Sequence, residues 1–131
     1  RYAQGNWGVI SNNTKLIFNA NHYDPDSVYN TTTGYFVAPS AGIYYFYAGI
    51  YTGHNSTTSG FAFRRNDSTS GVADYHGQFG AYTSQSDDSD HMITFSTVLD
   101  LAANDTVSIY TAVASSDLYE GHSHWGGFRL K

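Results

Sequence analysis

Cysteine is absent from this chain of 131 residues. A disulfide framework, a Cys-ligated zinc site and a cysteine nucleophile are therefore impossible. A chain of this length hides roughly two-thirds of its unfolded surface, so it can fold without cross-links. We expect one domain that covers residues 1–131.

Charged residues are also scarce, at 13%, against about 25% in an average domain. Six basic and eleven acidic residues give a net charge of −5. This balance disfavours nucleic acid, which needs phosphate-neutralising Lys and Arg, and it disfavours an anionic membrane surface. No apolar run is long enough to cross a membrane, so membrane insertion is not expected.

Residues that favour helices are nearly missing, because the chain has one Glu and two Lys. Aromatic residues reach 17%, with twelve Tyr, and Thr and Ser are abundant. These residue types suit pleated, half-buried strands. Gly, Asn, Asp and Ser recur at short intervals, which predicts a sandwich or barrel of many short strands.

Seven segments have strand-like patterns: 15–19, 35–38, 43–51, 61–65, 92–101, 106–113 and 124–130. The segment 43–51 is the most continuous apolar and aromatic run, so we expect a central strand buried on both faces. Its even-numbered residues share one side and its odd-numbered residues share the other. We expect residues 102–105 to join the two strands around them as a hairpin.

Seven residues in the first half of the chain have a distinctive spacing: Phe18, Asp24, Tyr29, Phe36, Gly42, Tyr44 and Phe46. This spacing resembles the globular-head signature of the complement C1q family. Seven of the eight signature positions match, and the eighth, which is usually aromatic, is Ala48. Residues 98–107 and 125–130 also resemble the family, although Asn104 stands where Gly is usual. The segment 53–90 matches weakly. We expect the signature residues to form the core.

The resemblance implies an all-β jelly-roll sandwich of about ten antiparallel strands, similar to tumour necrosis factor. It also implies a secreted protein that assembles as a homotrimer, with calcium near the three-fold axis in some members. Invertebrate members that stand largely alone commonly act as lectins or pattern-recognition proteins. The chain opens at Arg1 and shows no signal peptide, which is the pattern expected of a processed or excised domain.

A trimer would account for the surplus of tyrosines. Tyr45 and Tyr47 could face a neighbouring subunit, with their hydroxyls hydrogen-bonded at the rim. The alternative is that both side chains fill the second half of a monomeric sandwich.

Sugar sites combine a flat apolar face with a few fixed hydrogen-bonding groups. The segment 117–125 holds both kinds of side chain in one loop or at its edge, where binding residues concentrate. The predicted ligand contacts are Asp117, Tyr119, Glu120, His122, His124 and Trp125. The alternative is a polar loop in which Trp125 belongs to the core, since the C1q family has an aromatic residue there.

Two groups of residues are candidate metal ligands. Asp87, Asp88 and Asp90 lie in one acidic loop and could hold calcium, although the EF-hand pattern is incomplete and a solvated loop is the alternative. His122 and His124 would face the same side of an extended segment and could ligate zinc or copper. A third ligand for that pair is not evident.

Arg64 and Arg65 alternate along a strand, so one points to each face. One of them could hold an acidic sugar by a bidentate pair, and the alternative is an exposed charge or a subunit salt bridge. Five Asn-x-Ser/Thr sequons, at Asn12, Asn30, Asn55, Asn66 and Asn104, fit a secreted protein.

Catalysis finds little support in the sequence. The segment 121–125 comes nearest to a nucleophile elbow but lacks its closing glycine. We therefore expect no enzyme, but a secreted carbohydrate-binding homotrimer whose partners are glycans on cell or microbial surfaces. The alternatives are a head that binds a protein receptor, a structural trimerisation head, and a metal hydrolase built on His122 and His124.

Overall fold

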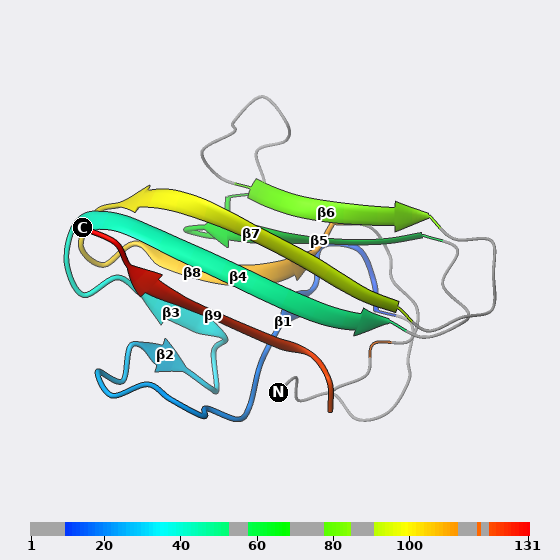
Figure 1. Ribbon diagram of the computed structural model, residues 1–131, viewed down its shortest axis with the longest axis horizontal. Helices are drawn as coiled ribbons and strands as arrows, with labels where there is room; N and C mark the ends of the chain where they lie inside the picture. Colours follow the sequence, from blue (N-terminus) through cyan, green and yellow to red (C-terminus); the bar gives the residue numbers. More distant parts are fainter. Residues whose placement is uncertain (1–9, 53–57, 69–77, 85–90, 113–117, 119–120) are drawn as a thin grey trace.

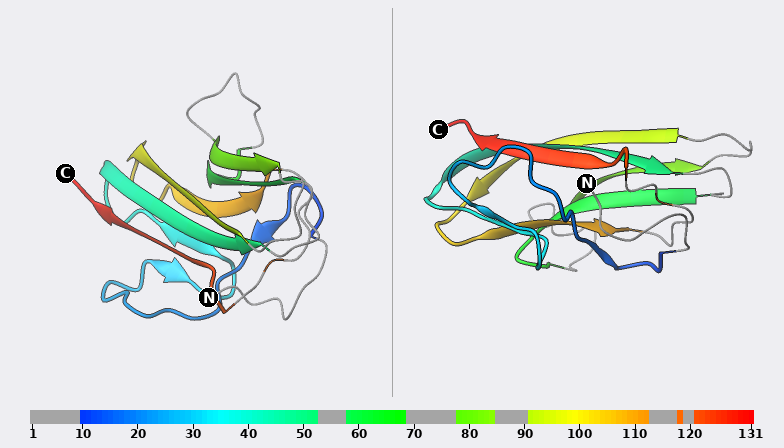
Figure 2. Two further views of the ribbon diagram at one scale, coloured as in Figure 1. Left: turned by 45° about the vertical axis from the view of Figure 1, so that its right-hand side comes forward. Right: turned by 90° about the horizontal axis from the view of Figure 1, so that it is seen from below.

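The computed structural model describes residues 10–52, 58–68, 78–84, 91–112, 118 and 121–131. These residues form nine strands and no helix, so the all-β prediction is confirmed. The strands are β1 (Lys15–Leu16), β2 (Tyr29–Asn30), β3 (Tyr35–Val37), β4 (Gly42–Thr52), β5 (Thr58–Arg65), β6 (Gln78–Ser84), β7 (His91–Leu101), β8 (Thr106–Thr111) and β9 (His124–Arg129). They make two sheets that lie in two layers (Figures 1 and 2). In this part of the chain there is no helix that could span a membrane.

The smaller sheet has the order β7–β4–β9, with β4 in the centre as predicted. β4 pairs with β7 along its whole length, from Gly42 opposite Leu101 to Thr52 opposite His91. On its other side, β4 pairs with β9. The aromatic run of β4 therefore sets the plane of this sheet, and its two neighbours come from the last third of the chain.

The larger sheet has the order β2–β3–β8–β5–β6. β1 pairs with β8 as well, with Leu16 opposite Ile109, while β3 places Phe36 opposite Val107. β1 and β3 therefore pair with opposite ends of β8, and β5 pairs with it too. The strands β2 and β6 were not predicted.

The core lies between the two sheets, where the even-numbered side chains of β4 meet β5 and β8. Phe46 contacts Phe63 at 5.9 Å between ring centroids, and burial of each such ring contributes about 2 kcal/mol. The signature aromatics belong to this core, as predicted: Phe18, Tyr44 and Phe46 are buried, and Tyr29 and Phe36 pack against them. Gly34 permits the turn before β3, because its φ of 76° suits glycine.

The hairpin predicted at residues 102–105 is wrong. The turn itself exists, because Asp105 N donates to Ala102 O at 3.1 Å. However, β7 belongs to the smaller sheet and β8 to the larger one, so the turn carries the chain from one layer to the other. Local sequence specifies the turn, whereas strand pairing is decided by which sheet buries each apolar face.

The prediction that β4 is buried on both faces is also wrong. Its even-numbered side chains are buried, but Tyr47 on the other side is 43% exposed. That other side is the outer surface of the sandwich, with no second sheet over it among the described residues. Tyr45 and Tyr47 therefore do not fill the second half of a monomeric sandwich, which was the alternative to a trimer contact.

Candidate functional site

The predicted sites fall partly outside the described residues. Asp87, Asp88 and Asp90 of the calcium prediction lie there, and so do Asp117, Tyr119 and Glu120 of the sugar prediction. His122, His124 and Trp125 are described, and they lie at the start of β9 or just before it. Ser123 Oγ between the histidines accepts a hydrogen bond from Tyr51 N at 3.0 Å, which holds this segment against the end of β4.

Trp125 is half-buried and points between the two sheets. It meets Tyr29 edge-on at 5.3 Å between centroids, Phe18 at 6.3 Å and Phe46 at 6.2 Å. These aromatic contacts hold the Trp125 ring against the hydrophobic core. Trp125 therefore packs in the core, as the alternative interpretation expected. Part of its side chain also lines a surface pocket.

His122 and His124 lie on one side of the chain, as the spacing predicted. The ring of His124 is 6.5 Å from that of Tyr47, and the ring of His122 is 5.3 Å from that of Tyr51. Both tyrosines point to the outer side of β4, so both histidines lie on the outer face. In the described part of the chain, no group of three His, Cys, Asp or Glu side chains could hold a metal ion.

A pocket of about 360 Å³ lies between β9 and the segment 18–29. We call it the edge pocket. His124 and Trp125 line it on the β9 side, and Tyr47 reaches it from β4. The opposite wall includes Asn21, His22 and Tyr23. The sequence pattern did not single out these three residues, because nothing local in it places residues 21–23 beside β9.

Asp24 holds this wall in place. Its carboxylate accepts hydrogen bonds at 3.0 Å from Val28 N, Tyr29 N and Asn21 Nδ2. Burial alone would raise the pKa of Asp24, but these three donors outweigh it and lower the pKa below its ordinary value. The bonds fix the wall while Tyr23, 87% exposed, stands free at the rim.

Two glycines of β9 line the β9 side of the edge pocket. A Cβ on Gly127 would come within 2.5 Å of the Phe46 ring, so only glycine leaves room for that core side chain. A Cβ on Gly126 would lie 2.8 Å from Tyr47 Oη. The Tyr47 ring therefore lies across β9, with its hydroxyl above Gly126.

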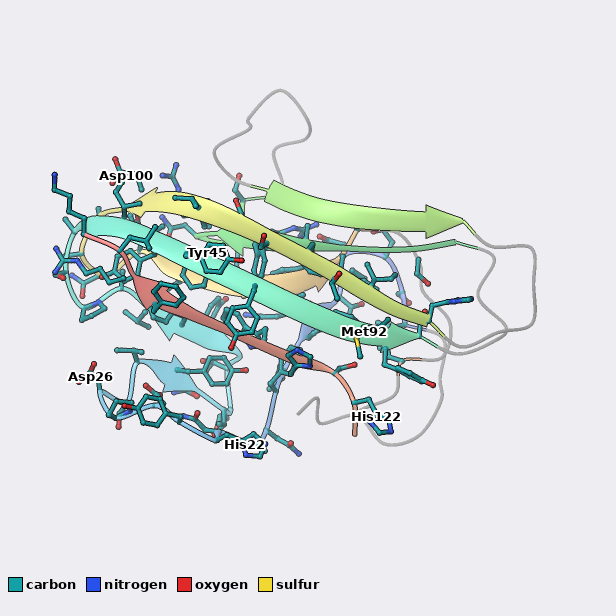
Figure 3. The ribbon with its side chains drawn as sticks, viewed as in Figure 1. His22, Asp26, Tyr45, Met92, Asp100 and His122 are labelled. Carbon is teal, nitrogen blue, oxygen red and sulfur yellow. The ribbon has the colours of Figure 1, made fainter. Side chains whose placement is uncertain are left out.

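The outer side of β7, β4 and β9 exposes several large apolar side chains among polar ones, and Figure 3 labels Tyr45, Met92 and Asp100 on these strands. We call it the apolar outer face. Of the seven large apolar side chains that are exposed among the described residues, four lie here: Tyr47, Met92, Val98 and Phe128. Val98 and Phe128 flank Tyr45 in the strand register, and Tyr45 packs on Phe128 at 5.4 Å between centroids. Val98, Phe128 and the half-buried Tyr45 form an apolar cluster on this face, and an exposed apolar cluster of this kind marks a candidate interaction site.

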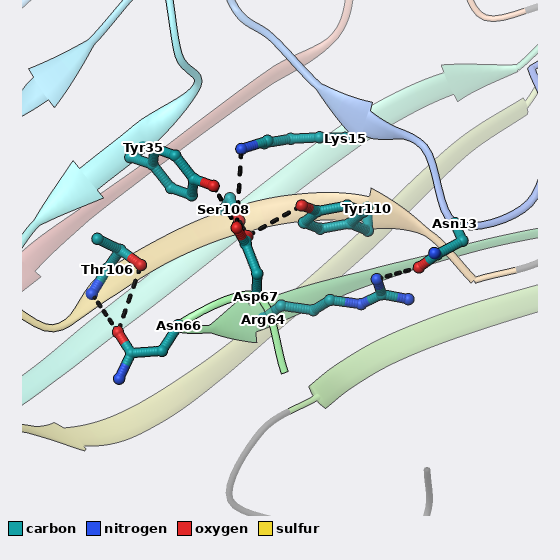
Figure 4. Close-up of polar contacts among 9 residues, drawn as sticks. All are labelled: Asn13, Lys15, Tyr35, Arg64, Asn66, Asp67, Thr106, Ser108 and Tyr110. Carbon is teal, nitrogen blue, oxygen red and sulfur yellow. Dashed lines mark hydrogen bonds and ion pairs between the residues drawn. The ribbon is translucent and has the colours of Figure 1, made fainter. Parts of the chain in front are cut away.

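The outer side of the larger sheet is different, because it carries a network around Asp67 (Figure 4). We call Asp67, Lys15, Tyr35, Ser108 and Tyr110 the Asp67 cluster. The Asp67 carboxylate accepts hydrogen bonds from the hydroxyls of Tyr35, Tyr110 at 2.9 Å and Ser108 at 3.3 Å. Lys15 Nζ lies 4.0 Å from Asp67 Oδ2 and 3.4 Å from the Tyr35 ring centroid.

These contacts determine the ionisation of the Asp67 cluster. Burial alone would raise the pKa of Asp67, but the tyrosine hydroxyls and Lys15 outweigh it and lower the pKa. For Tyr110, burial and then the Asp67 carboxylate raise the pKa far above its ordinary value. The polar groups of this cluster form hydrogen bonds and an ion pair with one another. The cluster therefore stabilises the position of Asp67, in the turn that follows β5.

The side chains of Arg64 and Arg65 both make contacts within the chain. Arg64 is buried, bonds Asn13 Oδ1 and stacks on Tyr110 at 4.2 Å from the ring centroid. Arg65 Nη1 donates to Asp100 O at 3.4 Å. The acidic-sugar role suggested for one of them therefore has no support in this geometry.

Comparison with known proteins identifies the fold. The globular domain of zebrafish complement 1qA matches with a TM-score of 0.64 and 17% identity, over 96% of each chain. The Eiger TNF from S. frugiperda matches with a TM-score of 0.68 and 17% identity, over 99% of this chain and 88% of the other. These likenesses confirm the predicted jelly roll.

Sequence comparison gives the family. No curated protein matches the chain. The C1q domain family matches residues 4–130, and this is nearly the entire chain. The resemblance inferred from the signature residues is thereby confirmed, and the chain belongs to the C1q domain family.

Proposed function

We propose that this chain is an extracellular, lectin-like recognition domain that works as a homotrimer and binds glycans on cell or microbial surfaces. The observation that carries the proposal is the edge pocket, where exposed aromatic side chains stand beside hydrogen-bonding groups. Three weak sites on one rigid body would give avidity on a glycan-coated surface.

Family membership supports the trimer. C1q and TNF homologues form trimers, C1q domain proteins are typically extracellular, and the family is generally non-enzymatic. The apolar outer face is the surface that a second copy would cover, since its burial stabilises an assembly. Four sequons are described, at Asn12, Asn30, Asn66 and Asn104, and none of them lies in β4, β7 or β9. Glycans at these positions would leave the apolar outer face free.

The side chains of the edge pocket support the proposal that the ligand is a sugar. A sugar ring packs its C–H surface on an aromatic side chain and directs its hydroxyls to polar groups. Tyr23 offers the most exposed ring, at 87%. Asn21, His22 and His124 supply donors and acceptors around it. We therefore centre the proposed site on Tyr23, with the predicted contacts His124 and Trp125 on the opposite wall.

The charge of the edge pocket favours a neutral sugar. Among its described lining residues there is no Lys or Arg to pair with an acidic sugar. The Asp24 carboxylate accepts three hydrogen bonds from this wall, so most of its acceptor capacity is already used within the chain. Part of the lining is apolar, with Phe18, Ala20 and Val28. This surface suits the methyl of an acetamido group, so we propose N-acetylated neutral sugars such as N-acetylglucosamine.

Calcium is a separate part of the proposal. Asp87, Asp88 and Asp90 provide carboxylate oxygens in one acidic segment, and hard cations prefer such ligands. If calcium orders the site, a chelator will reduce glycan binding. If the chelator has no effect, the calcium proposal fails while the sugar proposal stands.

A glycan array, run with and without chelator, tests the proposal. We expect signals on glycans that end in N-acetylglucosamine, and we expect Tyr23→Ala to abolish them. Tyr23→Phe is the matched control, because it keeps the ring and removes only the hydroxyl, so most of the signal should remain. A silent array with the wild-type protein would reject carbohydrate binding, and full binding by Tyr23→Ala would reject the site.

A second function is favoured by the apolar outer face. A head that only trimerises, or that engages a protein receptor through grooves between subunits, needs this face and no pocket. Trimer formation together with a silent array would support that function.

A further inference from the structure

We infer that sugar binding in the edge pocket and self-assembly through the apolar outer face are coupled, because Tyr47 and His124 belong to both surfaces. The inference rests on the proposed function and adds its regulation. It concerns the affinity of each single site and is separate from avidity.

The coupling begins with two rings that cross between neighbouring strands. Tyr47 of β4 stands opposite Gly126 of β9, and His124 of β9 stands opposite Gly49 of β4. A Cβ on Gly126 would lie 2.8 Å from Tyr47 Oη, and a Cβ on Gly49 would lie 2.7 Å from His124 Cε1. Each ring therefore rests on the glycine of the opposite strand, and the two rings are 6.5 Å apart.

This arrangement gives both rings two roles. Because they lie along the sheet, one side of each ring rests on backbone and the other belongs to the apolar outer face. Both side chains also line the edge pocket. Figure 3 shows His22 on the far wall of that pocket, and Met92 and Tyr45 on the apolar outer face.

In the isolated chain, the rings of Tyr47 and His124 are only partly covered by other residues. Tyr47 is 43% exposed and His124 is also exposed. A sugar that binds the isolated chain must order these side chains, and such ordering costs free energy. A second copy packed on the apolar outer face holds the rings down before the sugar arrives. The trimer therefore binds sugar more tightly at each site than the monomer does.

Linkage makes the effect reciprocal. If assembly raises the affinity for sugar, sugar must strengthen assembly by the same free energy per site. Saturating N-acetylglucosamine will therefore lower the concentration at which the wild-type trimer dissociates.

The decisive experiment compares the wild-type trimer with a monomer whose pocket is intact. Val98 is 54% exposed on β7 opposite Tyr45, and it does not line the pocket. Val98→Glu places a charge in the interface, and an unpaired buried charge is strongly unfavourable, so this variant will be monomeric. Ala103→Glu adds the same charge in the turn after β7 and will stay trimeric. Calorimetric titration with free N-acetylglucosamine, which is monovalent, excludes avidity.

We expect the Val98→Glu monomer to bind N-acetylglucosamine about tenfold more weakly than the wild type, and Ala103→Glu to match the wild type. Equal affinity of trimer and monomer overturns the coupling and leaves the proposed function intact. No binding by the wild-type trimer overturns the proposed function, and the coupling falls with it. A wild-type protein that is monomeric in solution overturns the coupling and the homotrimer of the proposed function, while sugar binding by that monomer would leave the carbohydrate site standing.

A second measurement needs no variant, so it covers the case in which Val98→Glu does not fold. Sedimentation velocity of the wild-type protein over a dilution series, with and without N-acetylglucosamine, reports trimer dissociation directly. We expect sugar to shift dissociation to lower protein concentration. An unchanged dissociation curve at saturating sugar would contradict the coupling by linkage.

Discussion

The two outer faces of the sandwich satisfy their side chains in opposite ways. On the larger sheet, Asp67 accepts three side-chain hydrogen bonds and lies beside Lys15, so its polar groups are paired within the chain. On the smaller sheet, Val98 and Phe128 are each more than half exposed. The first face needs no partner, whereas the second gains stability when another surface covers it. The comparison identifies the face through which the proposed trimer would assemble.

The strongest test of this comparison adds the same charge to the apolar outer face and to an exposed turn of the larger sheet. Phe128→Glu places a carboxylate on the apolar outer face, and burial of a carboxylate costs several kilocalories per mole. We expect a folded monomer in place of the proposed trimer, as measured by sedimentation equilibrium. Thr33→Glu adds a carboxylate in the exposed turn before β3 and should leave the trimer intact. If Phe128→Glu remains trimeric, the assembly surface lies elsewhere.

The next test removes the charge at the centre of the Asp67 cluster. Asp67→Asn keeps the size of the side chain but loses the carboxylate that accepts from Tyr35, Tyr110 and Ser108. Hydrogen bonds to charged groups are worth more than neutral ones, so the free energy of unfolding should fall by about 2 kcal/mol. Chemical denaturation at neutral pH, in the monomeric Phe128→Glu background, measures this loss without assembly. Asp26→Asn, at an exposed position, is the control and should change little.

The pH dependence of that difference sharpens the interpretation. The pKa of Asp67 is lowered from 3.8 in the folded chain, so its stabilisation is complete above that value. It is lost as the pH falls through the lower pKa of the folded state. The stability gap between Asp67 and Asp67→Asn proteins should be constant between about pH 5 and about pH 8, below the range where Tyr110 titrates, and should close in stronger acid. Asp24 and Asp105, whose pKa values are also lowered, are common to both proteins and cancel. If the stability gap persists in strong acid, the loss in Asp67→Asn comes from packing and not from the charge of Asp67.

The smallest expected effect concerns Lys15, which lies over the Tyr35 ring near Asp67. Exposed cation–π contacts and surface ion pairs each contribute little, so Lys15→Gln should lower the free energy of unfolding by less than about 1 kcal/mol. Thermal unfolding at low and high salt in the same monomeric background checks this, and the difference should shrink in salt. Lys131→Gln serves as control. A loss as large as that of Asp67→Asn would show that Lys15 organises the cluster.

The candidate site was predictable only in part. The sequence identified His124 and Trp125, because a histidine and an aromatic residue in a polar segment fit a sugar site. It could not identify His22 and Tyr23, since these residues precede β9 by about one hundred positions and only packing brings them to it. It also could not decide that Trp125 packs into the core, because burial depends on Phe18, Tyr29 and Phe46 from other strands.

The sequence by itself determined the class of the fold. Alternating aromatic residues in β4 and abundant turn residues predict a sandwich or barrel of strands, because strand periodicity is a local property, and the resemblance of the signature residues to the C1q family implies the jelly roll. Only the tertiary structure decided which strands pair, as the turn at 102–105 shows by crossing between sheets. It also decided that Tyr45 and Tyr47 face outward, since one side of β4 meets the core and the described residues place no second sheet over the other. Pairing and burial depend on contacts between distant segments, and local sequence patterns do not encode these contacts.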